Sequence, residues 1–141
     1  VPHNWAGLAA SGLVLALGVF AAVLVGRAGQ PALGVCLAGV TSLLASPISW
    51  SHHYIWIVPL GIALWQAKAL PAWFRAFGGF YVFWFALSPF KYLPKSHFVE
   101  LHYNLGQHLI ADSGVYLGVL LLVAGLVVAL RARSGKLALP S

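Results

Sequence analysis

The chain has 141 residues, of which 61% are hydrophobic and only 7% are charged, and its mean hydropathy is +0.90. A soluble domain carries roughly a quarter charged residues, so the composition excludes an ordinary water-soluble domain, a coiled coil and a disordered chain. Eight Lys and Arg against two Asp and Glu give a net charge of +6. These charges are too sparse for a nucleic-acid-binding stripe. The composition predicts an integral membrane protein.

Cysteine and methionine usage adds two expectations. The one cysteine, Cys36, lies in an apolar run, which leaves no disulfide framework. The sequence has no methionine, even at position 1. We therefore expect residues 1–141 to be a single membrane-embedded region, the C-terminal part of a larger polytopic protein.

Apolar runs divide the chain into candidate membrane spans. A hydrocarbon core about 30 Å thick requires about 20 apolar residues in a helix. Five runs approach this length, and they predict an all-α, polytopic helical bundle with about five transmembrane helices. We expect Pro59 to kink the third of them. The runs cover residues 6–26, 32–48, 54–67, 76–90 and 114–130.

The basic residues predict how these spans are oriented. If five spans alternate in direction, six basic residues fall on one side, which the positive-inside rule assigns to the cytoplasm. The opposite side receives Lys91, Lys95, both acidic residues and all six histidines. The sequence thus predicts a multi-pass plasma-membrane protein whose chemistry lies on the extracytoplasmic face. The six basic residues are Arg27, Lys68, Arg75, Arg131, Arg133 and Lys136.

The most distinctive stretch is Ser-Pro-Ile-Ser-Trp-Ser-His-His at 46–53. Irregular backbone near a membrane survives only where protein buries it or where it lines an aqueous cavity. A helix that restarts at Tyr54 would point its N-terminal N–H groups toward an anion such as a phosphate. The alternative is an interfacial turn whose histidines only meet lipid headgroups.

This stretch, with an apolar span on each side, resembles the actinobacterial membrane glycosyltransferases of family 87. The resemblance covers the C-terminal portion of such an enzyme. It implies a GT-C fold and an inverting mannosyltransferase that uses a polyprenyl-phosphate-mannose donor and a glycolipid or lipoglycan acceptor. The family's catalytic aspartate belongs to an early outer loop that nothing in this chain matches. We therefore expect the chain to be inactive alone.

Transfer from a lipid monophosphate needs stabilisation of the leaving phosphate. An imidazole titrates near neutral pH, so we expect His52 and His53 to be catalytic by donating to that phosphate or compensating its charge. Ser49 and Ser51 would add hydroxyl donors, and Trp50 would pack on the sugar or the prenyl chain.

The segment 91–112 is the second polar region. Lys91 and Lys95 are candidate ligands for a lipid phosphate; the alternative, which the sequence favours, is that they anchor the chain to lipid headgroups. Apolar residues recur every three or four positions from Phe98 to Leu109 and predict a short amphipathic helix on the outer membrane surface. His108 and Asp112 would share a face of this helix and could form a structural pair.

Three alternatives stay open at this stage. One is another outer-face transferase, such as an arabinosyltransferase or a glycan–lipid ligase. A second is a non-enzymatic membrane transport or binding subunit. The third is a zinc or copper site formed by the histidines, but no HxH or HxxxH pair is present. We expect no metal, no cofactor and no nucleic-acid partner.

Overall fold

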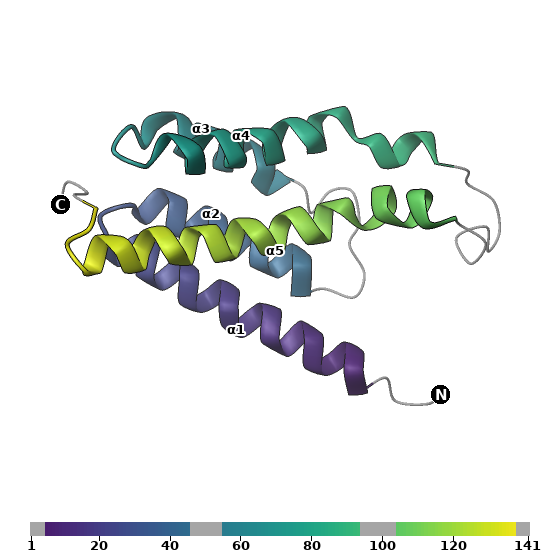
Figure 1. The fold of residues 1–141 in the computed structure, drawn as a ribbon, viewed down its shortest axis with the longest axis horizontal. Coiled ribbons are helices and arrows are strands. Elements are labelled where there is room, and N and C mark those ends of the chain that lie inside the picture. The colour runs from purple at the N-terminus through teal and green to yellow at the C-terminus, as the bar shows by residue number, and fades with distance from the viewer. Residues whose placement is uncertain (1–4, 46–54, 94–103, 138–141) are drawn as a thin grey trace.

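The computed structural model describes residues 5–45, 55–93 and 104–137, and this part of the chain is all-helical. Successive helices run in opposite directions along a common bundle axis (Figure 1). The expected helical bundle is confirmed. The helices are α1 (Trp5–Arg27), α2 (Pro31–Ala45), α3 (Ile57–Gln66), α4 (Ala72–Leu87), the 3-10 helix η2 (Pro89–Tyr92) and α5 (Leu105–Arg133).

Helix length separates α1 and α5 from the others. With 23 and 29 residues, these two are long and apolar enough to cross a membrane. At 1.5 Å per residue, they extend about 34 and 43 Å, against a hydrocarbon core of about 30 Å. The other three α-helices have 15, 10 and 16 residues. The number of five spans therefore stays a prediction.

A tight turn between α1 and α2 directs the chain back along the bundle. Gly29 has a φ of 85°, the left-handed conformation that glycine adopts without steric cost. The amide of Gln30 donates to the carbonyl of Val25, and the amide of Gly29 donates to that of Gly26. These two bonds form a Schellman motif. Pro31 is the first residue of α2. The N–H at this position would have no hydrogen-bond partner within the helix, so proline costs no hydrogen bond there.

Pro59 does not kink α3, contrary to the expectation from the sequence. The α-helix begins at Ile57, so Pro59 lies in its first turn. The first four N–H groups of a helix have no partner within the helix, so proline removes no hydrogen bond there.

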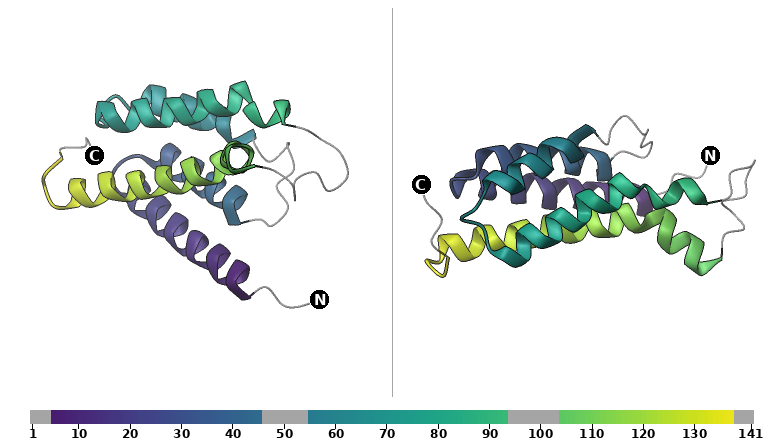
Figure 2. Two further views of the ribbon diagram at one scale, coloured as in Figure 1. Left: turned by 45° about the vertical axis from the view of Figure 1, so that its right-hand side comes forward. Right: turned by 90° about the horizontal axis from the view of Figure 1, so that it is seen from above.

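Only part of the surface helix expected from Phe98 to Leu109 can be compared with the structure, because residues 98–103 lie outside the described part of the chain. The last residues of this expected helix, from Leu105 onward, belong to the same helix as the final apolar run. Asn104 accepts from the amide of Gln107, whose side chain accepts from the amide of Asn104. This capping box begins the helix before the run itself. Figure 2 shows the first turns of α5 turned away from the axis of its remaining length.

The core lies where α1, α2 and α5 meet. Helix α1 packs mainly on α2 and α5, and α4 packs on α3 and α5. Leu37 and Leu121 are fully buried at this centre, as is Phe74 of α4. The first half of α1 diverges from the bundle (Figures 1 and 2), and none of its residues before Gly18 is buried.

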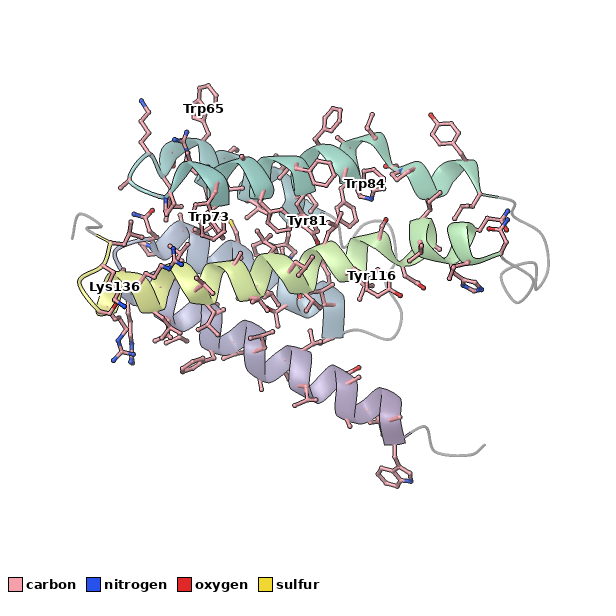
Figure 3. All side chains as sticks on the ribbon, viewed as in Figure 1. Trp65, Trp73, Tyr81, Trp84, Tyr116 and Lys136 are labelled. Atoms are coloured by element: carbon pink, nitrogen blue, oxygen red, sulfur yellow. The ribbon has the colours of Figure 1, made fainter. Side chains whose placement is uncertain are left out.

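Large apolar side chains cover the outside of the bundle. Leu13 is 72% exposed and Trp65 is 77% exposed, and the same pattern extends along the outer faces of the helices (Figure 3). Monomeric soluble proteins rarely expose contiguous apolar surface on this scale. Together with the two membrane-length helices, this surface indicates a membrane protein.

The six basic residues that the sequence places on one side lie at one end of the bundle, which we call the basic end (Figure 3). The ends of α1, α3 and α5 and the starts of α2 and α4 meet there. Arg75 donates from Nε to the carbonyl of Leu64, at 3.3 Å. Among the described residues, the one carboxylate is Asp112, in the early part of α5 at the opposite end.

Glycines allow the helices to approach closely. A Cβ at Gly34 of α2 would lie 2.7 Å from the carbonyl oxygen of Ala22 in α1, so the two backbones touch. In α5, a Cβ at Gly114 would lie 2.5 Å from the Phe85 ring, and one at Gly118 would lie 3.1 Å from the Tyr81 hydroxyl. The Gly-x-x-x-Gly spacing of this helix thus accommodates aromatic side chains of α4.

Candidate functional site

Most of the residues expected to act on substrate lie outside the described part of the chain. These residues are Ser49, Trp50, Ser51, His52, His53 and Lys95. Lys91 contributes its backbone to η2, but its side chain is not described. The described residues therefore define the surroundings of the candidate site, which are the helix ends that flank the segment 46–54.

These helix ends lie partway along the bundle axis. Helix α2 begins and helix α3 ends at the basic end, and at 1.5 Å per residue they extend only about 22 and 15 Å from it. In Figure 1 they stop short of the far ends of α4 and α5. Ala45 and Ile57 therefore lie closer to the basic end than the end of α4, η2 and the start of α5 do. We call these three segments together the rim.

Close contacts fix the position of each flanking end. The indole of Trp56, just before α3, packs on the backbone of Gly39 in α2, with no room for a Cβ there. Leu44, at the end of α2, reaches Gly118 of α5, where a Cβ would lie 2.9 Å from its Cδ2. Close contacts thus hold both helix ends that flank the segment 46–54 within the bundle.

The rim above these ends is held by a hydrogen bond between α4 and α5. The indole Nε1 of Trp84 donates to the hydroxyl of Ser113 at 2.8 Å, and that hydroxyl donates to the carbonyl of Ile110 at 2.7 Å. The sequence analysis did not identify this pair. Its two members are 29 positions apart, and neither has a local pattern that marks a partner.

A strained residue ends α4 at the same rim. Ser88 has a φ of 48°, which is uncommon for a residue with a Cβ. Its amide donates to the carbonyls of Trp84 and Phe85, and its hydroxyl donates to Phe85. Pro89 follows and prevents the α-helix from continuing. η2 then packs against α5.

His108 and Asp112 lie one turn apart in the first part of α5, and both are exposed. This part of the helix is at the end opposite the basic end, as the sequence predicts for both residues. Within residues 5–45, 55–93 and 104–137, no three His, Cys, Asp or Glu side chains gather closely enough to hold a metal ion.

Two curated relatives show what this bundle is similar to. Over 65 residues, 43% of the chain, it is 40% identical to a polyprenol-phosphate-mannose-dependent alpha-(1-2)-phosphatidylinositol mannoside mannosyltransferase of Mycobacterium tuberculosis. The chain is similar to a polyprenol-phosphate-mannose-dependent mannosyltransferase. Over 108 residues, 74% of the chain, it is 30% identical to the protein of the same name from Mycolicibacterium smegmatis.

The chain spans 15% and 24% of the length of these two relatives. No protein-family profile matches it, and no solved structure matches it.

Proposed function

We propose that the chain is part of a membrane mannosyltransferase that moves mannose from a polyprenyl-phosphate donor to a glycolipid acceptor. The observation that carries this proposal is the similarity to two mycobacterial relatives whose names specify both the donor and a phosphatidylinositol mannoside acceptor. A bundle with two membrane-length apolar helices suits an enzyme whose two substrates are both lipids.

The segment 46–53 is the proposed catalytic element. His52 or His53 stabilises the leaving phosphate, while Ser49, Trp50 and Ser51 contact the donor, and Lys91 and Lys95 attract a lipid phosphate. The positions of Ala45 and Ile57 support this assignment, because polar residues at membrane depth are found where they face the interior of a bundle or a water-filled cavity. The acceptor attacks the anomeric carbon of mannose as the bond to phosphate breaks, which inverts the configuration in one step. A general base takes the proton of the acceptor hydroxyl.

Donor specificity tests the proposal. Membranes that contain the full-length protein should transfer radiolabelled mannose from synthetic polyprenyl-phosphate mannose to added phosphatidylinositol mannoside. They should not do so from GDP-mannose when polyprenyl-phosphate-mannose synthesis is blocked. Membranes from cells that lack the gene are the control. Transfer of mannose from GDP-mannose while this synthesis is blocked would refute the proposal, and so would the absence of transfer from either donor.

The extracytoplasmic placement of the site leads to a separate prediction. In a chain freed of Cys36, a cysteine at Tyr92, which is 86% exposed beyond α4, should react with an impermeant thiol reagent on intact cells. A cysteine at Ser134, exposed at the basic end, should react only after the cells are opened. Neither substitution changes the charges that determine orientation. The reverse labelling pattern would place the site on the cytoplasmic face.

A further inference from the structure

A groove runs along the outer side of the contact between α2 and α3. Its volume is about 370 Å³. The buried side chains of Cys36 and Ala63 form its floor, and the exposed side chains of Val35 and Ile62 form its walls. Trp56 closes the end near the candidate site. Apart from Gln66 at the other end, its lining is apolar.

A second depression, at the basic end, continues this groove. Its volume is about 470 Å³, and it shares Ala32, Ala63 and Gln66 with the first. Its own lining adds polar groups, among them the side chains of Gln30 and Lys68. The two depressions together form one surface feature, with an apolar part along the helices and a polar, basic part at the end of the bundle.

The shape of the feature favours a lipid over another helix. Helices in direct contact have axes 8–10 Å apart, so the seam between α2 and α3 is narrow. A helix with its side chains is about 10 Å wide and would lie across this seam without entering it. A single hydrocarbon chain is thin enough to lie along this seam between the two helices.

The charge of the polar part favours an anionic headgroup over a zwitterionic one. Lys68 lines it, and the other five basic residues lie at the same end of the bundle. The one carboxylate among the described residues, Asp112, lies at the opposite end. A phosphate that enters the depression therefore meets Lys68, at the basic end of the bundle, without a competing acid from the described part of the chain.

We propose that this feature is a binding site for one anionic phospholipid of the leaflet at the basic end. Its phosphate lies by Lys68, with the amides of Gln30 and Gln66 within reach of the headgroup, and one acyl chain lies between α2 and α3. The proposal requires only that the bundle is embedded in a bilayer. It is independent of the transfer reaction.

Nondenaturing mass spectrometry of the protein taken from vesicles of equal phosphatidylglycerol and phosphatidylcholine tests the site. The wild-type protein should retain one phosphatidylglycerol. Ala32→Phe, which fills the junction of the two depressions, should abolish this retention, since Ala32 is exposed and the core is not disturbed. Ala38→Phe, on another exposed face of α2, is the matched control and should retain the lipid.

A charge variant tests the headgroup contact without altering the groove. Lys68→Gln should reduce the preference for phosphatidylglycerol over phosphatidylcholine about fivefold, the effect of removing one cation near an anionic lipid. Lys136→Gln removes the same charge from the basic end but does not line the feature, so its effect should be smaller. Equal effects of the two variants, or equal retention by Ala32→Phe and Ala38→Phe, would overturn the proposal. So would displacement of phosphatidylglycerol by an equal amount of polyprenyl phosphate, because the groove would then hold the donor's chain.

Discussion

Replacing His52 and His53 with alanine, one at a time in the full-length protein, should slow mannosyl transfer at least about a hundredfold at one of the two positions. A donor that stabilises charge on the leaving phosphate acts more strongly in the transition state than in the ground state. Its loss should therefore lower kcat more than it raises KM. The measurement is transfer from radiolabelled polyprenyl-phosphate mannose, normalised to the amount of membrane-inserted protein.

Two comparisons separate catalysis from structure at these positions. Glutamine should restore part of the rate if neutral hydrogen-bond donation is enough, and none of it if the positive charge is required. A structural histidine would instead lower the amount of inserted protein and leave the specific activity nearly intact. Near wild-type rates in both alanine variants would show that the site is assigned to the wrong residues.

The second large effect is expected at the contact between α1 and α2. Gly34→Ala places a Cβ against the carbonyl oxygen of Ala22 and the backbone of Gly26. Backbone atoms in packed helices cannot move aside as a flexible side chain can, so the helices must separate. The overpacking should lower the free energy of unfolding by about 1–3 kcal/mol, as measured by denaturant titration in mixed micelles.

Gly12→Ala provides the matched control on the same helix pair. A Cβ at Gly12 has no neighbour within 4 Å, and alanine is favoured over glycine inside a helix by about 1 kcal/mol. This variant should be as stable as the wild type or more stable. Equal stability of the Gly34 and Gly12 variants would contradict the close contact between α1 and α2.

The sequence predicts the class and direction of the helices well, because both depend on local composition. Uncharged runs such as the one that ends at Arg27 identify α1 without reference to the rest of the chain. The turn at Gly29 and Pro31 has a local signal as well. Alternation of the helices then places six basic residues at one end, and the structure confirms that they gather there.

Features that depend on tertiary contacts or on exact helix ends are not predictable in this way. The hydrogen bond between Trp84 and Ser113 joins residues without a local pattern. Pro59 is tolerated without a kink because α3 begins two residues before it, and a hydropathy run does not give that boundary. The long α5 depends on the capping box at Asn104, which begins the helix well before its apolar run.

The site itself is the part that the sequence supports most and the structure least. The motif at 46–53 lies outside the described residues. The structure shows only the helix ends that flank it, which are the end of α2 and the start of α3. The lengths of α2 and α3 place these flanks partway along the bundle, because each helix extends only part of the way from the basic end.

Glycolipid analysis of cells that lack the gene tests the central claim most directly. If the protein transfers mannose to a glycolipid, mass spectrometry of extracted lipids should show an acceptor that accumulates one mannose short of its normal product. The wild-type gene should restore the product, and a gene that carries both His52→Ala and His53→Ala should not. An unchanged set of mannosylated lipids in the deletion strain would contradict the account.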